Sequence, residues 1–103
     1  MALDRIFDAL ASAPRRRILA WLAQAELTTT ELAARAAMSA PAMSRHLSVL
    51  ENAGLAASRR DGQRVLYSLV RDTVMEALSG FAAELSPPAR SGAGETKAQR
   101  EAI

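Results

Sequence analysis

The stretch Ser39–Gly54, SAPAMSRHLSVLENAG, reads as one short helix whose two ends are both marked. Ser39 is a favourable N-cap, because its hydroxyl can accept a hydrogen bond from a free backbone N–H of the first turn. Pro41 falls in that first turn, where its missing N–H costs nothing. Gly54 can adopt the left-handed conformation that often follows a helix. The stretch therefore predicts a helix with fixed ends, around which the rest of the chain is organised.

The two faces of this predicted helix differ in character. Apolar residues recur at helical spacing and form a single stripe, made by Met43, Leu47 and Leu50. The opposite face is small, polar and basic, with Pro41, Arg45, Ser48 and Asn52 at its centre and Ser44 and His46 on its flanks. A short helix anchored by one stripe and presenting such a face suits the major groove of DNA.

The composition excludes several classes of protein. The chain has 103 residues, about the size of one domain, and contains no cysteine. Disulfides, thiolate zinc sites and cysteine nucleophiles are therefore excluded. No apolar run approaches the roughly 20 residues of a membrane span, and the N-terminus lacks a signal-peptide pattern, so we expect a cytoplasmic protein with no membrane partner. The net charge of +2 is too small to identify a nucleic-acid binder.

Three further helices are predicted before Ser39. Apolar spacing places the first over residues 3–12, and Pro14 starts a second that runs to position 25. Residues 26–28 form a short connection or a single strand. Thr28 and Glu31 have the spacing of a capping box, which places a third helix over 31–38. This third helix, a tight turn and the helix from Ser39 together make the helix-turn-helix pattern.

The sequence period changes from 3.6 to 2 after Gly54. Residues 55–60 and 63–70 predict two strands, joined at Asp61-Gly62, a strong signal for a two-residue hairpin turn. Polar and basic residues gather at the hairpin tip, namely Arg59, Arg60, Gln63 and Arg64. A last helix is expected over 71–85, and the polar residues 86–103 read as a flexible tail. The predicted fold is mainly α with a small β-hairpin, a winged helix-turn-helix of about five helices and a two-stranded wing.

Several residues in a fixed order carry a family resemblance over about residues 3–85. They are Pro41, the run Ser44-Arg45-His46-Leu47, Leu50, Gly54-Leu55, Asp61-Gly62 and Tyr67-Ser68-Leu69. In this order and spacing the chain resembles the ArsR family of small bacterial transcriptional repressors. The resemblance implies a homodimer held by its first and last helices, with two recognition helices reading a two-fold operator on double-stranded DNA.

Apolar residues of the two end helices are compatible with such a dimer. They are Leu3, Ile6, Phe7 and Leu10 in the first helix and Leu78, Phe81 and Leu85 in the last. Together they offer more apolar surface than so small a monomer covers easily. The alternative is that they only fill one small core. We expect residues 1–85 to form one DNA-binding and dimerisation domain and 86–103 to form the tail.

The chain departs from the family pattern in two places. Many members carry glutamine before the recognition-helix proline, whereas this chain has Ala40, whose methyl can touch thymine but cannot hydrogen-bond a base edge. Many members also sense metals, through cysteines in the third helix or through histidines with carboxylates in the last. This chain has no cysteine, and residues 71–85 include no histidine. We therefore expect neither a metal site nor any other cofactor.

The sequence predicts a DNA-binding transcriptional regulator, a homodimeric repressor that could control its own gene. The expected DNA contacts are Ala40, Pro41, Ser44, Arg45, His46, Ser48, Arg59, Arg60, Gln63 and Arg64. The alternative is a winged helix that binds a protein partner without reading DNA. An enzyme is not expected, because the chain lacks a nucleophile–base pair and a phosphate-binding loop.

Individual residues also have simpler interpretations. Arg45 could be a solvated charge or a partner of Glu51, and the wing arginines could be edge charges that discourage aggregation. His46 fits packing against the preceding helix or a phosphate contact better than base reading. The run Arg15–Arg17 reads as a solvated face, with a phosphate contact as the alternative. Trp21 is most simply a core or interface residue, with ligand stacking as its alternative.

Overall fold

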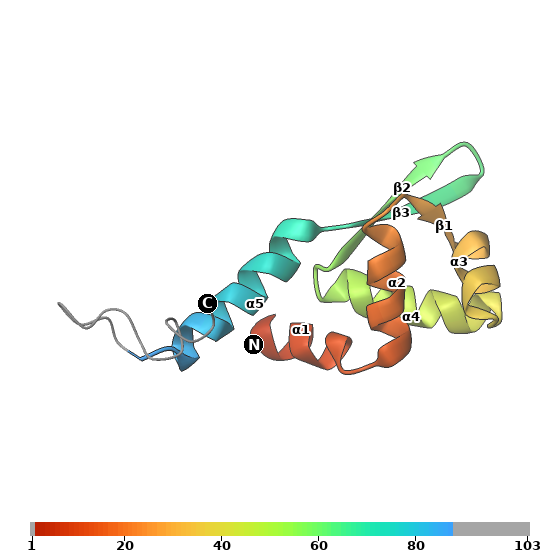
Figure 1. Cartoon of the computed structure of the whole chain (residues 1–103). Coiled ribbons are helices and arrows are strands. Elements are labelled where there is room, and N and C mark those ends of the chain that lie inside the picture. The colour runs from red at the N-terminus through yellow and green to blue at the C-terminus, as the bar shows by residue number, and fades with distance from the viewer. Residues whose placement is uncertain (1, 88–103) are drawn as a thin grey trace.

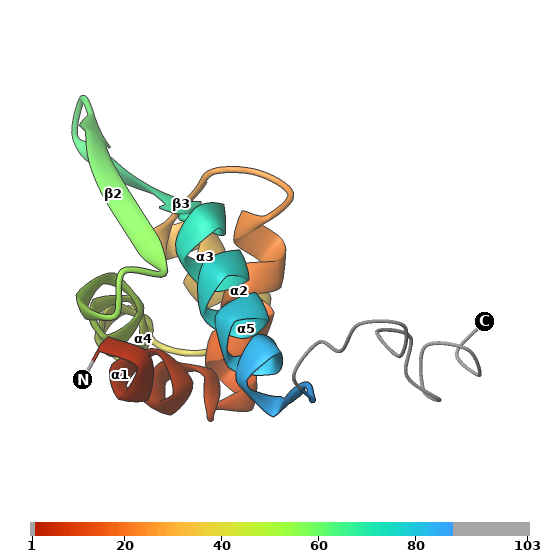
Figure 2. The ribbon, with the colours of Figure 1, turned by 90° about the vertical axis from the view of Figure 1, so that its left-hand side faces the viewer.

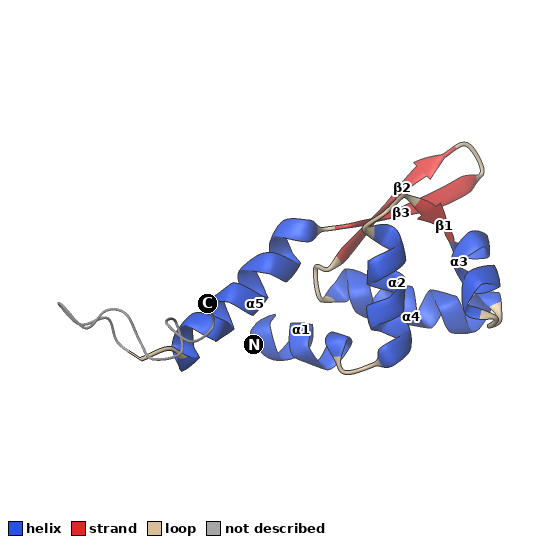
Figure 3. Cartoon of the chain, viewed as in Figure 1, coloured by secondary structure: helices blue, strands red, loops and turns tan. Residues whose placement is uncertain are grey.

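The computed structural model describes residues 2–87 (Figure 1). The described residues form helices in one body with a small antiparallel sheet at one side (Figure 3). The elements are α1 Ala2–Leu10, α2 Ala13–Leu22, β1 Leu27–Thr28, α3 Thr29–Ala36, α4 Ala40–Asn52, β2 Ala56–Asp61, β3 Arg64–Leu69 and α5 Arg71–Leu85. The predicted winged helix-turn-helix, mainly helical, is confirmed. The expected tail lies outside the described residues from position 88 onward.

Local capping signals fix the helix-turn-helix unit. Ser39 accepts a hydrogen bond from the backbone N–H of Ala42 at 3.2 Å, and Gly54, just beyond α4, has a φ of 77°. At the start of α3, the Thr28 hydroxyl accepts from the N–H of Glu31 at 3.1 Å, while the Glu31 carboxylate accepts from the N–H of Thr28 at 2.8 Å. Both predicted caps are therefore confirmed, although α3 starts and ends two residues earlier than predicted.

The core lies where α2, α3 and α4 meet. Its largest fully buried side chains are Ile18, Leu32, Met43, Leu47, Leu50 and Leu55. The predicted stripe of α4 is thus buried along its whole length, as are Ile18, Leu19 and Leu22 of α2. Burying one such side chain contributes about 1.5–3 kcal/mol, so this stripe holds α4 firmly against the other helices.

The sheet has a third strand beside the two predicted for the wing. Its order is β1-β3-β2, all antiparallel, with Leu27 opposite Tyr67 in the added pair. Residues 26–28 therefore contain a strand, one of the two alternatives left open by the sequence. The hairpin turn also differs, because Asp61 pairs with Arg64 and the loop residues are Gly62 and Gln63. Gly62 has a φ of 67°, which suits the first loop position of a type II′ turn.

Helix α5 follows the sheet and passes beside α1 (Figure 2). The rings of Phe7 and Phe81 meet edge to face, with centroids 5.2 Å apart. No residue of α5 is buried, and its large apolar side chains are exposed to 56% at Met75, 43% at Leu78, 39% at Phe81 and 69% at Leu85. The helix therefore covers little of the core and leaves an apolar face open.

The length and hydropathy of the helices can be compared with those of a membrane span. Among residues 2–87, no helix is long and apolar enough to cross a membrane.

Candidate nucleic-acid interface

The outward face of α4 is open to solvent along its length. The exposed residues include Ala40, Pro41, Ser44, Arg45 and Ser48. Within the described residues Arg45 forms no ion pair, and Glu51 instead accepts a hydrogen bond from the Ser58 hydroxyl of β2 at 2.8 Å. The suggested Arg45–Glu51 pair is therefore not formed. This leaves an uncompensated guanidinium among small polar side chains, an arrangement that can donate to phosphates or to base edges.

His46 is half-buried at the edge of this face and contacts α2. Its Nδ1 lies 3.4 Å from Nη1 of Arg15, and since arginine only donates, Nδ1 accepts and Nε2 carries the proton. The pKa of His46 is lowered from its ordinary value, first by burial and then by the nearby charges of Arg15 and Arg45. His46 is therefore a neutral, packed side chain whose Nε2–H is free of this contact.

Arg15 and Arg16 hold the end of α1. Nε of Arg15 donates to the carbonyl of Ala9 at 2.7 Å, and Nη1 of Arg16 donates to the carbonyl of Leu10 at 2.6 Å. These carbonyls belong to the last turn of a helix, where intrahelical partners are missing. The prediction of a solvated charge run is wrong for Arg15, which is half-buried, whereas Arg16 is exposed as predicted although it also makes this hydrogen bond. The sequence did contain one indication of this role, because Arg15 and Arg16 directly follow the break between the first two helices.

The register of the hairpin divides its arginines between two faces. Arg59 and Arg64 lie on one face, where Arg59 pairs with Glu26 at 2.8 Å and Arg64 pairs with Asp61 at 2.9 Å. The hydrogen bond from Arg59 lowers the pKa of Glu26 and raises that of Arg59. The sequence did not indicate the Arg59–Glu26 pair, because 33 residues separate the partners.

Arg60 lies on the opposite face of the hairpin from Arg59. Ser58 shares this face and donates a hydrogen bond to Glu51 of α4, so the face is turned toward α4. In the described part of the chain, Arg60 has no ion-pair partner. In Figure 2 the hairpin rises from beside α4 and projects beyond the helices. Arg60 and Arg45 are thus the two uncompensated cations that the structure places on α4 and on the wing face beside it.

The described residues do not fit the metal sites of metal-sensing relatives. No group of three or more His, Cys, Asp or Glu side chains within residues 2–87 could hold a metal ion. Helix α5 offers carboxylates at Asp72, Glu76 and Glu84 but no histidine. Zinc and similar ions need several nitrogen or sulfur ligands, which this set does not supply.

Comparison with known proteins gives a consistent result. A family model described as bacterial regulatory protein, arsR family, matches residues 13–58. A probable mercury resistance operon repressor of Streptomyces lividans is 39% identical over 75 residues, covering 69% of this chain and 60% of the relative. The regulator KmtR of Mycobacterium tuberculosis is 39% identical over 87 residues, covering 81% of this chain and 65% of the relative.

A solved structure is similar over most of both chains. It is the homodimeric winged helix-turn-helix DNA-binding domain of a possible ArsR-family transcriptional regulator from Mycobacterium bovis. The TM-score is 0.69 at 32% identity, and the match covers 81% of this chain and 79% of that one. The two curated relatives above are longer, and this chain spans about three fifths of their length.

Proposed function

The chain belongs to the ArsR family of bacterial regulatory proteins, and on this basis we propose that it is a homodimeric, DNA-binding transcriptional repressor. In this proposal residues 1–85 are one domain that binds DNA and dimerises, and two copies occupy a two-fold operator. The observation that carries the proposal is the exposed polar face of α4, with the uncompensated guanidinium of Arg45 at its centre.

The α4 face supplies the sequence preference. Arginine is suited to bidentate contact with O6 and N7 of guanine, and serine hydroxyls can contact several bases or phosphates. Arg45 is the principal reader in this proposal, Ser44 and Ser48 assist it, and the methyl of Ala40 lies against thymine. Pro41 shapes the first turn. His46 serves as a phosphate contact through Nε2–H, because Arg15 already occupies its other ring nitrogen.

The wing supplies affinity that depends little on sequence. Arg60 contacts the phosphates or the minor groove beside the α4 site, since it carries no acidic partner among residues 2–87. Arg59, Gln63 and Arg64 contribute less, because Glu26 and Asp61 offset the two arginine charges. Contacts of this kind release counterions, so binding weakens steeply as salt rises.

Half-buried apolar side chains of α1 and exposed apolar side chains of α5 form the dimer interface in this proposal. They are Leu3, Phe7, Leu10, Leu78, Phe81 and Leu85, whereas Ile6 lies in the core of its own chain with only 7% exposed. A two-fold axis through this interface would set two α4 helices about one DNA turn apart, roughly 34–36 Å. The homodimeric state of the M. bovis domain supports this arrangement.

The test is to select a binding sequence from a random duplex library and to compare it with a scrambled duplex by fluorescence anisotropy. Arg45→Ala should cost about 1–3 kcal/mol on the selected sequence and relax discrimination. Arg60→Ala should weaken both duplexes evenly and reduce the salt slope by about one. Arg71→Ala is the matched control, because it removes one arginine at the start of α5.

Equal affinity for the selected and scrambled duplexes would contradict the proposed function. That result, together with a stable protein partner found by copurification, would instead favour the alternative of a protein-binding module.

A further inference from the structure

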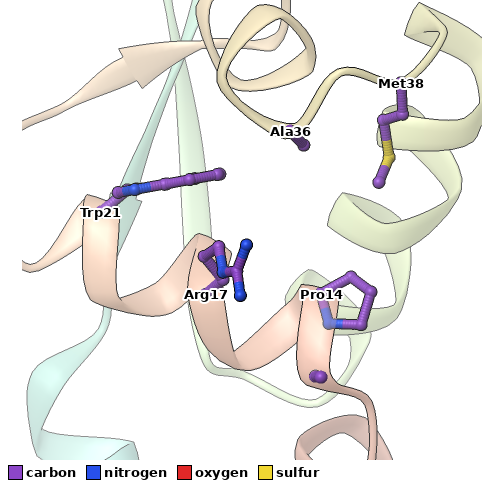
Figure 4. A pocket seen from close by; sticks show the side chains of 6 residues that line it. Pro14, Arg17, Trp21, Ala36 and Met38 are labelled. Atoms are coloured by element: carbon purple, nitrogen blue, oxygen red, sulfur yellow. The ribbon is translucent and has the colours of Figure 1, made fainter.

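A cavity of about 150 Å³ lies between α2 and the end of α3. Figure 4 shows its walls, which come from α2 on one side and from Ala36 and Met38 on the other. The α2 residues Pro14, Arg17 and Trp21 are spaced by three and four positions, so they share one face of that helix. The cavity is thus built by consecutive helices and by the turn that leads into α4.

The lining of the cavity is apolar except for one arginine. Trp21, Pro14, Met38 and two alanines provide apolar walls, and Arg17 provides the only charge. In Figure 4 the Arg17 guanidinium extends into the space between Trp21 and Pro14. An apolar cavity of roughly 150 Å³ is large enough to bind benzene. The cavity therefore offers room for one small ring beside one cation.

A second cation lies near the tryptophan. The guanidinium carbon of Arg35 is 6.0 Å from the centroid of the Trp21 ring, within the range of a cation–π contact. Neither Arg17 nor Arg35 forms an ion pair within the described residues. Since no Asp or Glu lines the cavity as described, its charge is complementary to an anion.

We propose that this cavity binds a small aromatic carboxylate. The ring stacks on Trp21 between Pro14 and Met38, and the carboxylate pairs with Arg17. A guanidinium and a carboxylate form strong, charge-assisted hydrogen bonds, which selects an acid over a neutral molecule of the same shape. Trp21 is half-buried and packs against the core, as the sequence predicts, and its place beside Arg17 in an open cavity also supports the alternative of ligand stacking.

The position of the cavity links it to the recognition helix. Met38 immediately precedes Ser39, the N-cap of α4, and Ala37 between Ala36 and Met38 has a left-handed φ of 54°. A ligand that spreads or draws together these walls would move the first turn of α4. By linkage, a ligand that changes the affinity for DNA has its own affinity changed by DNA by the same factor. This regulatory step rests on the proposed function, whereas ligand binding does not.

The direct test follows the indole N–H signal of Trp21 by NMR while benzoate is added to the full chain. Trp21 is the only tryptophan, so its signal is unambiguous. Benzamide is the neutral control of nearly equal shape. We expect benzoate to shift the signal in a saturable way and to bind at least about tenfold more tightly than benzamide. Equal affinities for the two compounds would overturn the proposal. The absence of a saturable shift up to 10 mM benzoate would also overturn it, because this concentration would detect a dissociation constant of roughly 1 mM.

Two variants assign the site. Arg17→Gln should reduce benzoate binding to the level of benzamide and leave benzamide unchanged, whereas Ala36→Leu should fill the cavity and abolish both. Arg16→Gln is the matched control, because Arg16 donates to Leu10 and does not line the cavity. An Arg17→Gln protein that still prefers benzoate would overturn the assignment, even if the Ala36→Leu protein failed to fold.

The regulatory step has a separate readout. Saturating benzoate should change the affinity for the selected duplex by about fivefold or more, and Arg17→Gln should remove that change. If benzoate binds and DNA affinity stays constant, the ligand site stands and its regulatory role is wrong. If benzoate binds but the protein has no preferred duplex, the proposed function fails and the ligand site again stands.

Discussion

Helices α4 and α5 both carry an apolar stripe, but only the stripe of α4 is buried within its own chain. Met43, Leu47 and Leu50 are each 0% exposed, whereas Leu78 and Leu85 of α5 are 43% and 69% exposed. Helix α4 also has a side-chain N-cap, whereas Val70, the N-cap residue of α5, provides no side-chain hydrogen bond. The difference indicates that α4 is positioned by its own domain, while α5 needs a further surface to bury its stripe.

The largest effect is expected from a core truncation in α4. Leu47→Ala truncates a fully buried side chain of α4 and should lower the free energy of unfolding by about 2–5 kcal/mol. Urea denaturation monitored by circular dichroism measures this loss. Val49→Ala in the same helix is the control, because Val49 is only half-buried and should cost about 1 kcal/mol or less. Equal losses would show that α4 is not held by its stripe.

A charge on the stripe of α5 should act on assembly instead. Leu78→Glu places a carboxylate on the open apolar face and should weaken the proposed dimer by about 2–3 kcal/mol, roughly 30- to 150-fold. Sedimentation velocity over a concentration series measures the dissociation constant. Ala83→Glu is the matched control, because it adds the same charge on the opposite side of α5. If both variants dimerise like the original chain, α5 does not form the interface.

The two left-handed residues that border α4 give opposite predictions. Gly54→Ala places a Cβ at a φ of 77° and should destabilise the domain by about 1–2 kcal/mol, although Thr73 Cγ2 lies at an ordinary contact distance of 3.7 Å. Ala37→Gly relieves a φ of 54° and should stabilise it by roughly 0.5 kcal/mol after the entropy cost of glycine. Shifts of the urea midpoint measure both. Shifts of the same sign would contradict this interpretation.

The features that the sequence predicted are those set within a few residues. The Ser39 cap, the Thr28–Glu31 capping box and the stripe of α4 each depend on neighbours three to seven positions apart. Their physics is local, so their pattern is visible in the chain. The same applies to the outward face of α4, because burial of one stripe leaves only one orientation for Arg45.

The features that escaped prediction depend on contacts between distant segments. The sequence left residues 26–28 as a connection or a strand, because β1 has only two residues and its pairing with β3 lies some 40 positions along the chain. The Arg59–Glu26 pair needs that same strand to bring Glu26 to the wing. The turn was displaced by one residue because glycine tolerates a positive φ at either loop position, so Asp61-Gly62 alone does not set the register.

The smallest predicted effect is a dependence of stability on pH that arises in α4 and has no equivalent in α5. The pKa of His46 in the folded chain is lowered, chiefly by burial, so the unfolded chain binds its proton more readily. The stability that neutral His46 contributes is present above about pH 6.5, its ordinary pKa, and is lost as pH falls through the lower folded pKa. Helix α5 contains no histidine and has no counterpart.

Urea denaturation at pH 7.5 and pH 5.5 measures how much stability each variant loses on acidification. The carboxylates titrate in every variant, so a difference between variants reports on the histidine. His46→Gln keeps a polar side chain against Arg15 and cannot take up a proton, so it should lose less stability on acidification than the original chain. Gln24→His, at an exposed position after α2, is the control, because a solvated imidazole gains no such difference between the folded and unfolded states. Equal losses in the original chain and the His46→Gln variant would show that the contact of His46 with α2 does not hold the ring neutral.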